Sequence, residues 1–201
     1  TSCLSDVLHQ MEHQLYTCEM LDKPILDRTK ENALYARYRA FIEGDPQAIL
    51  MSEVRAHTLE DLAKQTQALQ ADIQAKALAY DVKILYEEEA NQALELRKAG
   101  LGLIGNMVGD KKAIGCIEDT AVSLAYLPEF IADFQQIMKD FKQEGVYYAH
   151  AGAGELHIRP IFNMKKSEDI QQFVEITKAV AKLAKRYKAS FSGEHGDGIV
   201  R

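Results

Sequence analysis

The sequence predicts an α+β fold, a ferredoxin-like sandwich with a mainly antiparallel sheet and helices packed on one face of it. Segments with the apolar spacing of helices alternate with short segments that read as strands, and the order strand, helix, strand recurs along the chain. Glycines between residues 146 and 161 indicate a hairpin, whose two strands run antiparallel. No internal repeat or low-complexity linker divides the chain, so we expect one domain over residues 1–201.

The first half of the chain reads as scaffold, because eleven of the twelve glycines lie after position 99. A helix is expected from Thr58 to Ala77, since Thr58 can cap its first turn and Leu69 and Ile73 continue an apolar stripe. The other segments expected before residue 100 are a helix at 2–14, an extended piece at 15–20, a helix from 24 that breaks before 41, a strand at 48–54, a strand at 80–86 and a helix at 87–100.

The second half carries more glycine and is expected to hold the site. Phe173, Ile176, Val180 and Leu183 mark the buried stripe of its last helix. The segments expected after residue 100 are a strand at 112–118, a helix at 127–144, the hairpin at 146–161, a helix at 167–187 and a short strand at 190–192.

Composition excludes several classes of protein. The formal net charge of −6 argues against a nucleic-acid surface, which needs clustered lysine and arginine. No apolar run approaches the length of a membrane span, and no signal peptide is recognisable. Cys3, Cys18 and Cys116 are odd in number and widely spaced, which favours a reducing compartment, and we expect the cytoplasm. The chain begins with Thr1, which suggests a fragment.

Two glycine-flanked clusters contain the residues that we expect to carry chemistry. In the first, His150 and His157 are seven residues apart, and on one straight strand they would be separated by roughly 23 Å. A tight hairpin with its tip at Ala153 and Gly154 would instead make them directly opposed partners on one face. Two imidazoles so placed can hold a divalent metal. The pattern alone also fits two ordinary packed histidines.

The second cluster, at 192–198, offers Glu194 as a third metal ligand and His195 as a group that moves protons. Two histidines and a carboxylate leave a position open for water or substrate, and they suit zinc, manganese or iron about equally. His9, Glu12 and His13 also share one helical turn, although an exposed helix face is the simpler interpretation.

Two arginines are candidate substrate-binding residues. Arg97 lies near the end of a helix beside a flexible glycine-rich segment, where a guanidinium can hold a carboxylate through two hydrogen bonds. Arg159 follows His157 by two residues and shares its face of the strand. The alternative for each is a cation that faces water.

Four segments, Arg97–Gly102, Ile117–Val122, His150–His157 and Gly193–Gly198, together resemble the C-terminal substrate domain of FAD-linked oxidases, a family that includes D-lactate dehydrogenase, the glycolate oxidase flavin subunit and D-2-hydroxyglutarate dehydrogenase. The resemblance covers nearly the whole chain. The segments 41–46 and 157–160 look most like the long bacterial members that carry an iron–sulfur domain after the flavin part.

The resemblance implies an FAD-binding domain before this segment, further sequence after it, and an isolated chain without activity. It implies that His150, His157 and Glu194 are the metal ligands, that His195 is the catalytic base and that Arg97 grips the substrate carboxylate. The implied reaction is oxidation of a D-2-hydroxy acid to the 2-oxo acid, with hydride transfer to flavin. The chain departs from the usual H-x-G-D-G-x-x-H pattern. Ala153 replaces the aspartate, and Glu155 stands where asparagine is common.

Other functions fit the residues less well. A stand-alone ferredoxin-like module that binds a metal or senses a ligand would need neither flavin nor a redox partner. A metallohydrolase could use the same histidines and glutamate to activate water, but no motif places a further acid or base beside them. Arg159 would favour a substrate with a second anionic group, and the sheet edge that an FAD domain would cover could promote homodimers.

Overall fold

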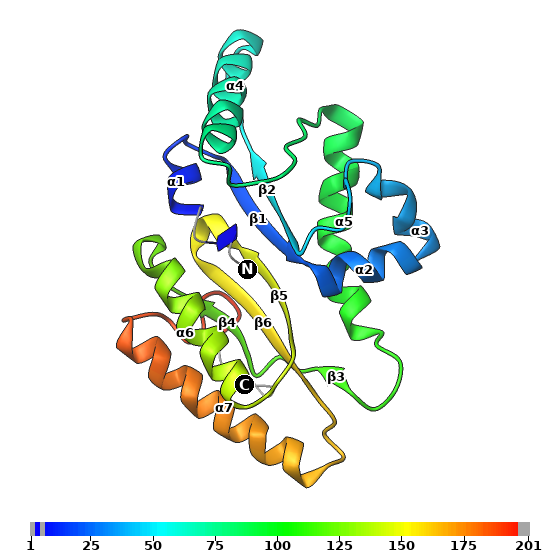
Figure 1. Cartoon of the computed structure of the whole chain (residues 1–201), viewed down its shortest axis with the longest axis vertical. Helices are drawn as coiled ribbons and strands as arrows, with labels where there is room; N and C mark the ends of the chain where they lie inside the picture. The colour runs from blue at the N-terminus through cyan, green and yellow to red at the C-terminus, as the bar shows by residue number, and fades with distance from the viewer. Residues whose placement is uncertain (1–2, 5–6, 197–201) are drawn as a thin grey trace.

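The computed structural model describes residues 3–4 and 7–196, and in these residues it forms one antiparallel sheet with helices on both sides (Figure 1). The strands of the sheet are β1 (Thr17–Asp22), β2 (Ala48–Glu53), β3 (Lys112–Ala113), β4 (Ile117–Ala121), β5 (Gly145–His150) and β6 (Glu155–Phe162). The α-helices are α1 (Val7–Met11), α2 (Lys23–Glu31), α3 (Ala33–Ala36), α4 (Leu59–Ala75), α5 (Glu87–Gly105), α6 (Leu127–Asp140) and α7 (Ser167–Arg186).

The strands pair in the order β2, β1, β5, β6, and the far side of β6 pairs with both β3 and β4 along different parts of its length. Every pairing is antiparallel. The second half of the chain runs β4, α6, β5, β6, α7, and then Ser190 forms an isolated antiparallel bridge to Ala121 of β4. This order of strands and helices is the one from which we expected a ferredoxin-like sandwich. The α+β class and the antiparallel sheet are confirmed.

Helices cover both faces of the sheet, whereas the sequence predicted helices on one. Side chains alternate between the faces along each strand. On β5, Ala149 packs in the larger hydrophobic cluster with Phe130 and Phe134 of α6, while Val146 and Tyr148 point the other way. The smaller cluster on that second face consists of Leu21, Ile25, Leu26, Leu96, Ile104, Val146 and Tyr148. Helices α2 and α5 therefore cover part of the second face, and the site described below lies on the same face.

Most predicted elements are present, with shifted ends. The capped helix at 58–77 appears as α4, in which the Thr58 side chain accepts a hydrogen bond from the Asp61 amide as expected. Helix α5 continues past Gly100 to Gly105, and Gly100 allows it to lie close to α2, since a Cβ there would stand 3.2 Å from Ile25. The last helix and both strands of the hairpin lie within two residues of their expected bounds.

Three element predictions are wrong. Residues 80–86 form no strand and pair with none of the described strands, and Tyr80 and Tyr86 are exposed. The strand expected at 112–118 is divided into β3 and β4, which meet different parts of β6. The helix expected at 2–14 is the shorter α1, although residues 2, 5 and 6 lie outside the described part of the chain.

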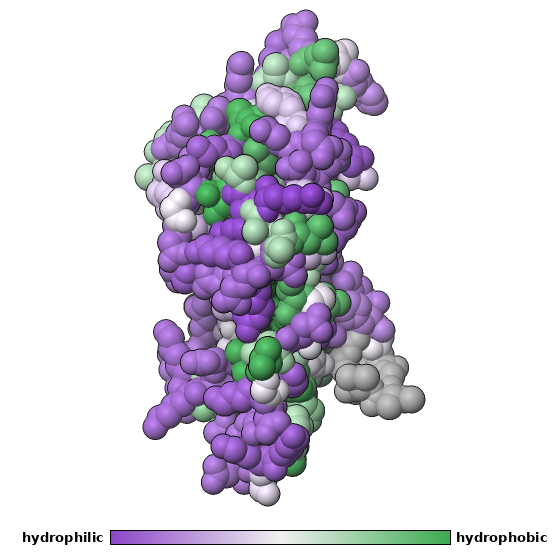
Figure 2. Space-filling model, turned by 90° about the vertical axis from the view of Figure 1, so that its right-hand side faces the viewer, coloured by the Kyte–Doolittle hydropathy of each residue, from purple (hydrophilic) through white to green (hydrophobic). Residues whose placement is uncertain are grey.

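None of the described helices is long and apolar enough to cross a membrane. On the side that Figure 2 shows, hydrophilic side chains predominate and apolar ones form separate patches among them.

Asp22 joins three elements at the end of β1. Its side chain is the N-cap of α2 and accepts a hydrogen bond from the Ile25 amide at 3.4 Å. Its other oxygen accepts a hydrogen bond from the Tyr147 amide of β5 at 2.6 Å. Burial raises the pKa of Asp22 to about 7 even though both amides favour the carboxylate. The residue therefore fixes where α2 leaves the sheet.

We predict that Asp22→Ala lowers the free energy of unfolding by about 2–4 kcal/mol, since it removes a helix cap and leaves a buried amide without its acceptor. Urea unfolding of the chain, followed by circular dichroism, measures the change. Asp110→Ala is the control, because Asp110 is exposed and its partner is the exposed Lys165. Equal unfolding midpoints for the two variants would contradict this role of Asp22.

Candidate metal and substrate site

The two histidines of the hairpin share one face but are not directly opposed. The turn between the strands contains four residues, with a short 3-10 helix at Ala151–Ala153 and Gly154 at φ +71°. His150 is therefore paired with Glu155, and His157 is paired with Tyr148. The expected two-residue tip at Ala153 and Gly154 is wrong. The histidines are diagonal neighbours instead, and their ring centroids lie 5.1 Å apart.

Each histidine uses its Nδ1 atom for a contact that orients the ring. The Nδ1 of His150 lies 2.9 Å from each carboxylate oxygen of Glu19 on β1. The Nδ1 of His157 lies 2.7 Å from the backbone carbonyl of Glu118 on β4. Because a carboxylate and a carbonyl accept hydrogen bonds, Nδ1 carries the proton in the neutral form of each ring, and Nε2 of that form has a free lone pair.

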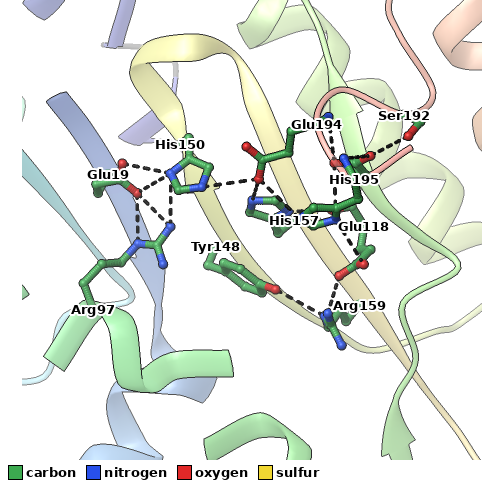
Figure 3. Close-up of polar contacts among 11 residues, drawn as sticks. Glu19, Arg97, Glu118, Tyr148, His150, His157, Arg159, Ser192, Glu194 and His195 are labelled. Atoms are coloured by element: carbon green, nitrogen blue, oxygen red, sulfur yellow. Dashed lines mark hydrogen bonds and ion pairs between the residues drawn. The ribbon is translucent and has the colours of Figure 1, made fainter. Parts of the chain in front are cut away.

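The two Nε2 atoms converge on one carboxylate oxygen. Oε1 of Glu194 lies 3.5 Å from Nε2 of His150 and 3.4 Å from Nε2 of His157 (Figure 3). Two ligand atoms that bind one tetrahedral ion at about 2.1 Å are separated by about 3.4 Å. The two distances to Glu194 match that separation, and the sequence prediction grouped the same three residues. The side chains whose ligand atoms all lie within 4.8 Å of one another are, however, Asp119, His157, Glu194 and His195, without His150.

The pKa values of the two histidines shift in opposite directions. The hydrogen bond to Glu19 raises the pKa of His150 despite partial burial, whereas burial lowers the pKa of His157. His157 therefore stays neutral and ready to bind a metal. His150 must lose its proton first, so acid conditions would disfavour a metal at this site.

Asp119 of β4 holds the segment that carries Glu194 and His195. It is fully buried, and its carboxylate accepts hydrogen bonds from the Ser192 hydroxyl at 2.7 Å and from the amides of Glu194 and His195 at 3.3 and 3.0 Å. Its backbone carbonyl accepts a fourth, from the Gly193 amide at 2.7 Å. Asp119 also lies within 4.8 Å of the ligand atoms of His157, Glu194 and His195. Its oxygens are already occupied, so it acts as a support for the metal ligands.

His195 stands between several acidic groups. Its Nε2 lies 3.3 Å from Glu194 Oε1, and its Nδ1 lies 3.4 Å from oxygens of both Glu118 and Asp119. Its ring stacks on that of His157 at 5.4 Å. A half-exposed imidazole at the edge of the site can accept a proton from a bound molecule and pass it to solvent. The last residues of this motif, Asp197 and Gly198, lie outside the described part of the chain.

Both candidate arginines flank this site, and each forms an ion pair with a glutamate. Arg97 of α5 contacts Glu19 through Nε at 3.0 Å and through Nη2 at 2.7 Å. Arg159 pairs with Glu118 and donates a hydrogen bond from Nε to the Tyr148 hydroxyl at 3.2 Å. Neither side chain simply faces water. The structure brings all six residues expected from the sequence to one end of the sheet.

Glu155 occupies a buried position beside Asp119. Burial, followed by the hydrogen bond with Asp119, raises the pKa of Glu155 to about 8. Glu155 is therefore largely protonated at neutral pH and donates to Asp119, as the asparagine amide that is common at this position in the family could. Its Oε1 finds no hydrogen-bond partner among the described residues.

A second group of possible ligands, His9, His13 and Asp72, lies away from this site, between the first helical segment and α4. The Nζ atom of Lys76 contacts both His9 and Asp72. A lysine cation beside the same atoms opposes a metal cation there. The group is better explained as an ion-pair network that holds α4 against the N-terminal helix, so the helix face is not simply exposed as the sequence suggested.

Sequence reasoning missed three supporting residues, namely Glu19, Glu118 and Asp119. The last two lie in a strand whose first four residues are all buried, and two adjacent acidic residues in such a strand are the signal that could have found them. Glu19 lies between Cys18 and Met20, which face the core. Its role has no local signal, because its partners are 78 and 131 residues away.

A family model described as FAD linked oxidases, C-terminal domain, matches residues 1–201. The chain belongs to this family. The resemblance inferred from four short motifs is thus confirmed over the full length of the sequence.

Curated relatives with the same name have similar sequences. D-2-hydroxyglutarate dehydrogenase of Pseudomonas putida is 28% identical over 204 residues, and the enzyme of that name from Escherichia coli is 26% identical over 215 residues. Each alignment covers 98% of this chain and 20% of the relative. The enzyme of that name from Haemophilus influenzae is 34% identical over 104 residues, which cover 52% of this chain and 10% of the relative. The chain thus spans about a fifth of the length of the relatives that it matches most fully.

Among solved structures, 4-ethylphenol oxidase from Gulosibacter chungangensis superposes with a TM-score of 0.55 at 11% sequence identity. The match covers 94% of this chain and 43% of that one. At this identity the likeness supports the fold alone.

We predict that Gly193→Ala displaces the segment 192–195. A Cβ at this position would stand 1.9 Å from Oε2 of Glu155, and that carboxyl group is buried, so it has little room to move. Loss of the contacts with Asp119 should expose the amides of Glu194 and His195. Hydrogen exchange measured by mass spectrometry should show faster exchange in the peptide that contains them.

Gly102→Ala is the control, since no atom lies within 4 Å of a Cβ at this position of α5. Exchange of the 192–195 peptide should be the same in this variant and in the wild type. Protection that persists in Gly193→Ala would show that the segment is not held as described.

Proposed function

We propose that this chain forms the substrate- and metal-binding part of an FAD-dependent oxidoreductase that converts a D-2-hydroxy acid to the 2-oxo acid. The observation that carries the proposal is the convergence of His150 and His157 on Glu194, with His195 beside them and an arginine on either side. The family match and the relatives named D-2-hydroxyglutarate dehydrogenase support it. A ligand-sensing module has no such support from relatives.

His150, His157 and Glu194 would hold the divalent metal, and the ligand atoms alone fit zinc, manganese or iron. When bound, a metal at this position supplies Lewis-acid polarisation of a hydroxyl group. The chain prepares for it by orienting both imidazoles through their Nδ1 atoms. The position left open in this ligand set is where the substrate hydroxyl belongs.

Three other residues act on the substrate in this proposal. Arg97 binds its carboxylate through the planar guanidinium, which matches two oxygens at once. His195 accepts the proton of the 2-hydroxyl group, because it lies beside the proposed ligands and can release the proton to solvent. FAD, the redox cofactor that the family name states, would supply the acceptor for the hydride of C2.

Arg159 makes a dicarboxylic substrate the favoured class. It lies on the same strand face as His157, and Tyr148 and Glu118 hold its side chain at the site. A second carboxylate on the substrate could pair with Arg159, because Arg97 binds the first carboxylate in this proposal. The relatives support this class through their name, which specifies a hydroxy acid with two carboxylates.

The remaining parts of the active site would come from the same polypeptide. We propose an FAD-binding domain before this segment and an iron–sulfur domain after it, and the greater length of the relatives leaves ample room for both. In this arrangement residues 1–201 are one domain of a larger enzyme and are inactive alone. A homodimer through the sheet edge remains a further proposal.

The cysteines support a cytoplasmic location. Cys18 and Cys116 are buried cysteines that form no disulfide among the described residues. Burial raises the pKa of Cys18 and of Cys116 to about 11, so both stay protonated and unreactive. Thiols without disulfide partners are typical of a reducing compartment.

We predict that His157→Ala removes most of the bound metal from the full-length protein, since one of three protein ligands is lost. Metal content per flavin, measured by mass spectrometry after dialysis against a chelator, tests this. His13→Ala is the matched control and should leave the metal content unchanged, because His13 belongs to the ion-pair network at α4. Unchanged metal in His157→Ala would remove His157 from the ligand set.

We predict that Arg159→Met reduces kcat/KM for D-2-hydroxyglutarate about 100-fold and for D-lactate less than about 5-fold, because a lost ion pair to a bound carboxylate costs about 2–3 kcal/mol. Steady-state kinetics of the full-length enzyme with both substrates measure the difference. Arg186→Met, on the exposed end of α7, is the control. Equal losses for the two substrates would refute a role of Arg159 in binding a second carboxylate.

A further inference from the structure

Glu19 uses one carboxylate to contact both a proposed metal ligand, His150, and a proposed substrate-binding residue, Arg97. Its two carboxylate oxygens each lie 2.9 Å from Nδ1 of His150. One of them, Oε2, also receives two hydrogen bonds from the guanidinium of Arg97 (Figure 3). The three side chains come from β1, β5 and α5, so no local sequence requirement brings them together.

The carboxylate of Glu19 is ionised and largely enclosed. Its side chain is 16% exposed, and that of Arg97 is 12% exposed. Its neighbours, Nδ1 of His150 and the guanidinium of Arg97, are both hydrogen-bond donors, which favour the charged carboxylate. Removing such charges from water costs free energy that a well-packed apolar pair would not cost. Stability of the fold therefore gives no reason to place them here.

The contacts of the Glu19 carboxylate with His150 and with Arg97 each suit a function. A ring nitrogen that donates to a carboxylate fixes the tautomer and the orientation of the imidazole, and leaves the opposite nitrogen more basic. In His150 that opposite nitrogen is the Nε2 atom that lies 3.5 Å from Glu194. At the same time, the carboxylate of Glu19 contacts one edge of the Arg97 guanidinium. The substrate would bring the same chemical group to Arg97.

We propose that Glu19 is a positioning residue for both the metal and the substrate. It directs Nε2 of His150 toward the metal, and its own carboxylate occupies Arg97 in place of the substrate carboxylate until the substrate binds. This inference rests on the proposed function, because it needs both a metal at His150 and a carboxylate at Arg97. On substrate binding, Arg97 exchanges one carboxylate for another, and Glu19 stays on His150.

The test compares Glu19→Gln with the wild type in the full-length enzyme. The amide keeps the size of the side chain and one acceptor oxygen but removes the charge, so the hydrogen bond that orients the ring of His150 is weakened. Metal retention against a chelator series should weaken about 10- to 100-fold. With the metal saturated, KM for the D-2-hydroxy acid should fall severalfold, because the charge of Arg97 is no longer neutralised.

The opposite directions of these two effects separate positioning from a merely structural role. A general loosening of the site would weaken metal retention and raise KM together. Glu53→Gln is the matched control, since Glu53 is a glutamate on the neighbouring strand β2 that also pairs with an arginine, Arg55. It should match the wild type in both measurements. If Glu19→Gln does not fold, Glu19→Asp, which keeps the charge but shortens the reach, should weaken metal retention without lowering KM.

A His157→Ala arm separates failure of this inference from failure of the proposed function. If His157→Ala retains its metal, the proposed metal site itself is wrong. If His157→Ala loses the metal while Glu19→Gln retains it as tightly as the wild type, only the role of Glu19 is overturned. A raised KM in Glu19→Gln would likewise overturn the exchange of carboxylates at Arg97.

Discussion

The arrangement of the site depends on one buried carboxylate. Asp119 lies in the middle of β4, and three donors from the segment 192–195 meet its side chain while a fourth meets its backbone carbonyl. Just before that segment, Ser190 forms an isolated bridge to Ala121 of β4. The hydrogen bonds to Asp119 thus fix the backbone that presents Glu194 and His195 to the hairpin histidines.

A buried anion needs compensation, and the surroundings of Asp119 provide it mainly through backbone amides. The positively charged residues of the site are paired elsewhere, Arg97 with Glu19 and Arg159 with Glu118. Glu155, which would otherwise add another negative charge, is kept protonated by burial and by Asp119 itself. The site thus contains many acidic residues but keeps their charges separated. The Nε2 atoms of His150 and His157 are left to face the one carboxylate that is half exposed, that of Glu194.

The sequence was sufficient for those parts of the fold that depend on local pattern. The cap at Thr58 and the apolar stripe of α7 specify their helices without reference to the rest of the chain. The segment 80–86 shows where such reasoning fails, because alternating apolar residues form a strand only when a neighbouring strand offers hydrogen bonds. The division of the expected strand 112–118 has the same origin, since it depends on how far β6 extends.

For the site, motif spacing identified the residues that present their chemistry to the open face, and glycines marked the turns that carry them. The hairpin register could not be obtained in this way, because a turn of four residues and one of two are equally compatible with the glycines at 152 and 154. The supporting residues Glu19, Glu118 and Asp119 also escaped. Their importance arises from contacts with residues 39 to 131 positions away, and only the folded sheet brings these together.

The two histidines of the hairpin differ in what holds them, and this difference bears on how the site can evolve. The ring of His157 is fixed by a main-chain carbonyl, that of Glu118, which every amino acid at position 118 would supply. The ring of His150 is fixed by the side chain of Glu19, which a single substitution can remove or replace. At the proposed metal site, natural variation could therefore change the orientation of the His150 ring by one substitution, whereas the orientation of the His157 ring depends on the backbone alone.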